Sequence, residues 1–362
     1  MLARKIVRVN PKVAVILVAL CLSAFFPENT MSADQADPHS LALAGGELSD
    51  AAAQQLENTL KQTPSDLSIR TKLLGYYLLH EFQSESARKV RQQHVLWIIQ
   101  NHPESEIAGL PEAGLNPRLN GEAYEQGAKL WRQQVTDHSK NAAILRNAAA
   151  FFLLSDHAFA EDLLKKGAVL EPNNPYWPEQ LGHLYSLESR RKSESDMKQS
   201  AATALKNFET AYALTTSDRE KSYMLDDLAK AAYDAGAFDK AKTYAEQLLE
   251  TANRQKRDWN TGNAIHHGNL ILGRLALRAG DVEKAKQHLI AAGKTPGSPQ
   301  LDSFGPSMTL AKELLEKGQR DVVLEYFQLC AKFWESGKDT LKDWTSVVKQ
   351  GAIPSFVATL DY

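Results

Sequence analysis

One pattern of residues occurs twice in succession between Leu225 and Gly293, and it constrains the fold more than any other feature of the chain. Apolar and small residues stand at matching relative positions in the two copies: Leu228, Ala229, Ala232, Gly236, Ala241, Ala245 and Leu248 in the first, and Leu272, Gly273, Ala276, Gly280, Ala285, Leu289 and Ala292 in the second. Each copy predicts two short amphipathic helices joined by a turn centred on glycine, with small residues where two helix backbones approach closely.

The same helix-pair unit can be followed along most of the chain. A glycine or alanine in the first helix of each pair serves as a register mark, and it recurs at Gly75, Ala148, Gly182, Ala229, Gly273 and Ala311. Positions 148 and 182 are 34 residues apart, whereas the later steps of 47, 44 and 38 residues are longer. These steps predict one repeated unit that carries insertions.

The residues after Asn174-Pro175 connect this unit to a known family. Trp177, Leu181, Gly182 and Tyr185 come close to W-x-x-L-G-x-x-Y, with the tryptophan displaced by one position. The chain therefore resembles the tetratricopeptide repeat (TPR) superfamily, as a divergent member with insertions between helices. The resemblance implies an all-α fold, a right-handed superhelical solenoid of antiparallel helix pairs. It also implies that a peptide or partner protein binds in a concave groove lined by the inner helices.

The first 33 residues have the composition of an export signal or membrane anchor. Four basic residues up to Lys12 precede the apolar run 13–26, which is shorter than the roughly 20 residues that span a bilayer comfortably. Three alternatives stay open: a cleaved signal peptide, an uncleaved anchor, and lipidation of Cys21, against which the large Leu20 before it argues. Each places the body of the protein outside the cytoplasm, in the periplasm or secreted from the cell.

Composition along the rest of the chain predicts four further segments. Pro38 and Gly45-Gly46 favour a flexible tether at 34–48. The following segments are degenerate TPR-like helices at 49–140 with an irregular, proline-rich loop at 101–118, a TPR-like array at 141–335, and a C-terminal capping helix and tail at 336–362. A second irregular stretch, 294–307, should protrude from the array or fold back on it.

Few residues of the chain are candidates for catalysis or metal binding. The chain has two cysteines, and Cys330 stands where a repeat places a small buried residue. His266 and His267 point about 100° apart on a helix, so they are poorly placed to share one metal ion. The sequence predicts no catalytic residue, no metal site and no cofactor. Two alternatives stay open: an enzyme or metal-binding protein whose site combines loops 101–118 and 294–307 with His266 and His267, and a membrane-tethered spacer.

Charge and register together suggest where and what the chain binds. The net charge of −2 gives no overall basic field, so we expect a protein or peptide partner and no nucleic acid. The family register places these candidates in the groove: Tyr76, His183, Tyr223, Lys230, Tyr233, His267, Arg274 and Arg278. Arg274 and Arg278 are four residues apart and suited to grip one carboxylate together. The Lys-Asn-Lys clamp of some family members is missing, which argues against a chaperone-tail ligand. The sequence predicts an exported, non-catalytic interaction scaffold.

Overall fold

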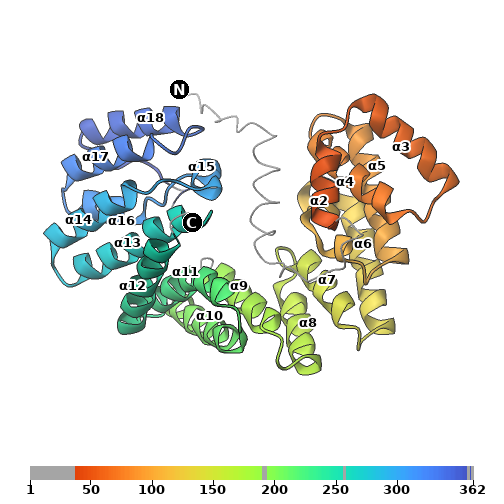
Figure 1. Cartoon of the computed structure of the whole chain (residues 1–362), viewed down its shortest axis with the longest axis horizontal. Helices are drawn as coiled ribbons and strands as arrows, with labels where there is room; N and C mark the ends of the chain where they lie inside the picture. The colour runs from red at the N-terminus through yellow and green to blue at the C-terminus, as the bar shows by residue number, and fades with distance from the viewer. Residues whose placement is uncertain (1–36, 190–193, 256–257, 357–358, 360–362) are drawn as a thin grey trace. The chain divides into compact units, whose positions relative to one another are not determined.

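The computed structural model describes residues 37–189, 194–255, 258–356 and 359, and these form two compact units divided after Pro172 (Figure 1). The division lies beyond residue 140, where the sequence predicts the change from degenerate to regular repeats. The described residues form helices and connecting turns, without strands. The predicted export segment 1–33 lies outside the described residues. Within the described ranges, no helix is both long and apolar enough to cross a membrane.

The first unit is built from short helices whose starts are capped by side chains. Its elements are α2 (Pro38–Gly46), α3 (Asp50–Gln62), α4 (Leu67–His80), α5 (Glu85–Asn101), the 3₁₀ turns η1 (Glu106–Gly109) and η2 (Pro111–Ala113), α6 (Pro117–Asp137), α7 (Ala142–Phe152) and α8 (His157–Leu170). A Ser, Asp or Asn side chain accepts a hydrogen bond from a first-turn amide at the start of each α-helix of this unit. Such caps satisfy amides that have no partner within the helix.

The predicted flexible tether is wrong over most of its length, because α2 occupies residues 38–46 and packs on α4. Asp37 caps α2, and Pro38 fits its first turn. A Cβ atom on Gly75 would lie 1.8 Å from the carbonyl oxygen of Ala42, and one on Gly45 would lie 1.9 Å from that of Lys72. The glycines therefore permit two backbones to touch, where the sequence had suggested flexibility.

The loop at 101–118 is irregular as predicted, apart from the 3₁₀ turns and the start of α6, and it is folded into the unit. Ile107, Leu110 and Leu115 are buried. Arg91 is buried beneath the loop, where its guanidinium donates to the carbonyl oxygens of Glu112 at 2.9 Å and Gly114 at 2.7 Å. The loop is thus held by packing and by a buried cation.

The second unit repeats helix pairs. Its elements are α9 (Tyr176–Ser189), α10 (Glu194–Leu214), α11 (Asp218–Asp234), α12 (Phe238–Arg254), α13 (Thr261–Arg278), α14 (Val282–Gly293), α15 (Pro299–Phe304), α16 (Thr309–Glu316), α17 (Arg320–Cys330) and α18 (Lys338–Lys349). Each helix from α9 to α13 packs on the next (Figure 1). Gly236, Gly280 and Gly318 form the turns of three pairs with positive φ angles of 77°, 84° and 74°. The chain is an all-α, TPR-like repeat of helix pairs, which confirms the predicted fold class.

Small residues close the interfaces between helices as the repeat pattern predicts. Ala229, Ala232, Ala241, Ala245 and Ala285 have no exposed surface. The prediction that Cys330 is a buried filler is confirmed as well, and burial raises the pKa of its thiol. Leu341 and Val348 of α18 are buried at the C-terminal end of this core.

Candidate functional site

Helices α11 and α13 lie against each other in the second unit and carry most of the predicted binding residues. Tyr223, Asp226, Lys230 and Tyr233 are spaced by three, four and three residues, so they share one face of α11. His267 and Arg274 of α13 contact side chains of that face. The structure therefore brings these residues of α11 and α13 into contact.

A partly buried charge cluster of Asp226, Lys230 and His267 joins the two helices at their middle. Asp226 Oδ2 accepts a hydrogen bond from Lys230 Nζ at 2.9 Å and lies 2.7 Å from His267 Nδ1. Burial alone would raise the pKa of Asp226, but His267 and Lys230 outweigh it and lower that pKa, so the carboxylate stays ionised. Burial lowers the pKa of His267 against the opposing effect of Asp226. The prediction that His267 lines a groove is wrong, because only 4% of its surface is exposed and its Nδ1 atom contacts the Asp226 carboxylate.

His266 is committed to the structure on the other side of α13. Its Nδ1 lies 3.2 Å from the carbonyl oxygen of Ala292, and its Nε2 accepts a hydrogen bond from the Ser307 amide at 3.1 Å. Burial, with the adjacent His267, lowers the pKa of His266 to about 3, so the imidazole is neutral. The Nε2 lone pair of His266 accepts the Ser307 amide and so holds segment 294–307 against α13. His266 therefore has no lone pair left to bind a metal ion.

Two arginines and two aromatic rings form an arginine–aromatic cluster at the C-terminal end of α11 and α13. The guanidinium carbon of Arg274 lies 3.9 Å from the ring centroid of Tyr233, and that of Arg278 lies 4.0 Å from the ring centroid of Phe238. The two rings pack edge to face with centroids 5.6 Å apart. Burial raises the pKa of Tyr233, so its phenol is uncharged at neutral pH. Stacking fixes the plane of each guanidinium and leaves N–H groups at its edge for hydrogen bonds.

The two arginines of this cluster are not equivalent. Arg274 Nε donates to Glu313 Oε1 of α16 at 2.9 Å, in a largely buried ion pair. Arg278 is exposed, and within the described part of the chain no carboxylate forms an ion pair with it. Because Glu313 already binds Arg274, the two arginines are not equally available for the joint binding of one carboxylate that the sequence predicts. Arg278 is the more accessible of the two.

A second aromatic group lies near the N-terminal end of α11. The Tyr223 hydroxyl donates to Asp258 Oδ2 at 3.0 Å and accepts from Arg219 Nε at 2.7 Å, and the Tyr223 ring lies 5.4 Å from that of Trp259. Trp259 is 42% exposed, an unusual exposure for so large an apolar side chain. We call these two rings the Tyr223–Trp259 pair.

The two remaining predicted residues are placed differently. His183 of α9 packs its ring edge to face on Phe208, with centroids 5.0 Å apart. Tyr76 belongs to the first unit and is buried against α3, where its hydroxyl donates to Asp50 Oδ1 at 2.7 Å. Burial and that hydrogen bond raise the pKa of Tyr76 to about 12. The prediction that Tyr76 lines a groove is therefore wrong.

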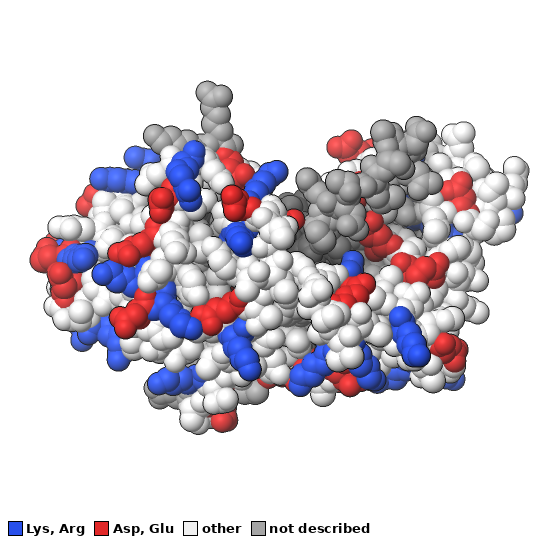
Figure 2. All heavy atoms as spheres, turned by 60° about the horizontal axis from the view of Figure 1, so that its bottom comes forward, with Lys and Arg blue, Asp and Glu red and all other residues white. Residues whose placement is uncertain are grey.

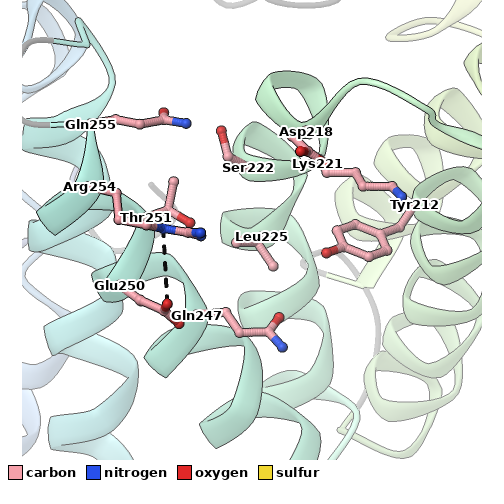
Figure 3. Close-up of a pocket in the computed structure, with 10 residues that line it drawn as sticks. All are labelled: Tyr212, Asp218, Lys221, Ser222, Leu225, Gln247, Glu250, Thr251, Arg254 and Gln255. Atoms are coloured by element: carbon pink, nitrogen blue, oxygen red, sulfur yellow. Dashed lines mark ion pairs between the residues drawn. The ribbon is translucent and has the colours of Figure 1, made fainter.

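Sequence reasoning missed a polar pocket of about 490 Å³ on another face of α11 (Figure 3). Its lining comes from the ends of α10, α11 and α12: Tyr212, Asp218, Lys221, Ser222, Leu225, Gln247, Glu250, Thr251, Arg254 and Gln255. Helical spacing shows that residues 218, 221, 222 and 225 share one face of α11. It does not show that residues of α10 and α12 enclose a pocket over that face.

Charged groups of both signs are interspersed on the surface view of Figure 2. Lysines and arginines alternate there with aspartates and glutamates, in keeping with the net charge of −2. A surface of mixed charge favours local contacts between single charged groups and a partner, because it produces no broad electrostatic field of one sign.

Comparison with known proteins gives similarity to solved structures alone. No protein-family model and no curated protein matches the chain. A human IFIT1 dimer with m7Gppp-AAAA is 17% identical and has a TM-score of 0.47, with 93% of this chain and 76% of that chain covered. Yeast Tom70 is 14% identical with a TM-score of 0.47, covering 93% and 70%. A human IFIT1 dimer with PPP-AAAA is 17% identical with a TM-score of 0.35, covering 88% and 77%. These values are too low to transfer a ligand.

Proposed function

We propose that the chain is a non-catalytic, TPR-type interaction protein that holds an acidic segment of a partner protein on the arginine–aromatic cluster of α11 to α13. The observation that carries this proposal is the exposed guanidinium of Arg278, which is stacked on Phe238 beside a second stacked arginine. A guanidinium held in one plane loses little freedom when a carboxylate binds its edge in a two-point contact.

The face of α11 that carries Tyr223 and Tyr233 suits an extended peptide. Tyr223 and Tyr233 are ten residues apart on α11, which corresponds to roughly 15 Å along the helix axis. A peptide of about five extended residues spans that length. An acidic residue on Arg278 would then be followed by an apolar or aromatic residue on the Tyr223–Trp259 pair. Arginine, tyrosine and tryptophan are the residue types that most often dominate interface energies.

The partly buried charge cluster gives this surface a fixed geometry. Lys230, Asp226 and His267 link α11 to α13 between the two proposed contact points. A surface that is already ordered pays less conformational entropy when it binds. The buried polar groups of α11 and α13 thus serve the proposed function by positioning and do not themselves contact the partner.

Capture from a native envelope extract tests the proposal. The bait is the chain carrying Arg278→Glu, compared with the unmodified chain and with an Arg118→Glu control on α6, an exposed residue of the first unit. We expect a partner that the unmodified chain and the control retain and the Arg278→Glu variant loses, with unchanged circular dichroism. Equal retention by all three baits would overturn the assignment of the surface.

We also propose that the chain is exported, on the strength of the basic and apolar pattern before residue 33. Fractionation of the native host followed by N-terminal mass spectrometry tests this. A mature start near residue 34, or an intact Met1 in the membrane fraction with the body accessible from outside, supports export by cleavage or by anchoring. An intact Met1 in the cytoplasmic fraction overturns it.

The expectation that the partner is not nucleic acid stays a prediction, based on net charge. Filter binding with a tetra-adenosine oligonucleotide, repeated at two salt concentrations, checks it. Electrostatic binding to phosphates would appear as retention that falls steeply with salt.

A further inference from the structure

The pocket of Figure 3 is a candidate binding site on a different side of α11 from the arginine–aromatic cluster. Its volume of about 490 Å³ lies within the range of roughly 300 to 1,000 Å³ that ligand pockets occupy. In Figure 3, Leu225 lies at the centre, Arg254 and Gln255 extend from α12 toward α11, and Tyr212 points its hydroxyl inward from α10. Three consecutive helices therefore contribute to one cavity.

Each long wall of the pocket carries one acid and one base. Asp218 and Lys221 belong to α11, and Glu250 and Arg254 belong to α12. The lining is therefore neutral overall but charged at both sides. A purely anionic ligand would meet two carboxylates here, and a purely cationic one would meet a lysine and an arginine. A ligand with one charge of each sign avoids both penalties.

These charges are only loosely engaged with each other. Arg254 Nε lies 4.0 Å from Glu250 Oε1, at the outer limit of an ion pair, and both side chains are about two-thirds exposed, at 69% and 67%. Lys221 Nζ lies 5.4 Å from the ring centroid of Tyr212. An exposed pair of this kind contributes little to stability, so a ligand can replace it at little cost.

The uncharged lining matches peptide groups. Gln247 and Gln255 carry an amide that both donates and accepts, and Thr251 carries a hydroxyl. The Ser222 hydroxyl donates to the Arg219 carbonyl oxygen at 2.6 Å and can still accept. Leu225 and the Tyr212 ring offer apolar contact for a small side chain. Backbone amides of a ligand need such paired donors and acceptors when water is displaced.

From the neutral, two-sign lining together with these amides and hydroxyls, we propose that the pocket binds a short free peptide with charged termini. Its carboxylate lies on Arg254 of α12, its ammonium group lies on Asp218 of α11, and its amides contact the glutamines. The pocket lies on a different face of α11 from the arginine–aromatic cluster, because residues 218, 221, 222 and 225 lie about 100° around the helix from Asp226, Lys230 and Tyr233.

Isothermal titration with trialanine as the probe tests the proposal. Four forms are compared on the full chain: free termini, N-acetylated, C-amidated, and blocked at both ends. We expect saturable binding of the free form in the millimolar range or tighter, and at least tenfold weaker binding of each blocked form. Equal binding of all four forms, or no saturation with the free form, overturns the proposal.

Two variants assign the charges. Arg254→Gln should remove the preference for a free carboxylate and keep that for a free ammonium group, whereas Asp218→Asn should do the reverse. Both side chains are exposed, so the fold is expected to survive, which circular dichroism checks. Arg118→Gln serves as the matched control. Arg278→Glu should leave trialanine binding unchanged, so failure of this site and failure of the partner surface are distinguishable.

Discussion

At the scale of single residues, side chains that sequence spacing alone marks as equivalent differ in burial and partners. His266 and His267 are adjacent, yet the first accepts from Ser307 and the second faces Asp226. Arg274 and Arg278 lie on the same helix face, yet Glu313 engages only the first. The repeat register predicted which residues share a face, because that follows from helical periodicity. It did not predict burial, which depends on side chains of other repeats.

The Asp226 cluster makes a stability prediction. Asp226→Asn keeps the size of the side chain but removes the charge that Lys230 and His267 face. We expect a loss of about 1–3 kcal/mol, since a partly buried cation loses its counter-charge. Thermal and urea unfolding measure it. Glu246→Gln removes an exposed partner of Lys242 and should change stability by less than about 0.5 kcal/mol. Equal effects of the two variants would contradict the structural role of the cluster.

Glu179 of α9 makes a prediction about pH. Burial, and then the carboxylates of Asp227 and Glu220, raise its pKa to about 8 from the usual 4.5. The folded state therefore holds a proton that the unfolded state has released between these pH values, so this contribution is favourable at low pH and is lost as pH rises from about 4.5 to about 8.

Glu179→Gln mimics the protonated acid and removes that dependence. We expect the variant to match the unmodified chain near pH 4 and to exceed it by about 1–3 kcal/mol above pH 8, a magnitude reduced because the side chain is only partly buried. Unfolding curves at both pH values test this. A variant less stable than the unmodified chain at the higher pH would show that Glu179 is ionised and paired there.

At the scale of elements, glycine has two different structural roles that the sequence pattern does not distinguish. Gly236 and Gly280 sit at turns with positive φ, as the repeat pattern predicted. Gly45 and Gly75 instead let α2 and α4 touch. The pair is 30 residues apart, so local composition at 34–48 suggested a flexible tether, whereas the partner that orders α2 lies in a later helix. The pocket of Figure 3 was missed for a related reason, since it depends on how α10 and α12 diverge.

Gly75→Ala tests the docking of α2. The added methyl group would lie 1.8 Å from the Ala42 carbonyl oxygen, so α2 must shift, at a cost of about 1–3 kcal/mol. Hydrogen exchange of the α2 amides should become faster. Gly46→Ala is the matched control, because its methyl group would meet the movable end of Leu79 at 3.0 Å. Slow exchange in Gly75→Ala would contradict the close contact.

At the scale of the whole molecule, the chain is a TPR-like array whose second unit carries the proposed partner surface. The resemblance in sequence was enough to predict the fold, because small residues at fixed spacing dictate how helices pair. It was not enough to predict a ligand, because that depends on which polar side chains remain accessible after the helices pack. Arg278 and Trp259 are exposed among the described residues of α13 and of the loop before it, and Tyr223 of α11 is half-buried.

Fluorescence anisotropy tests the partner surface with a labelled peptide library of the form acidic–x–x–x–aromatic, titrated with the full chain, Arg278→Glu and the Arg118→Glu control. We expect saturable binding to the full chain and the control, at least tenfold weaker binding to Arg278→Glu, and loss of binding when lysine replaces the acidic residue. Binding that is unaffected by both Arg278→Glu and the lysine peptide would contradict it.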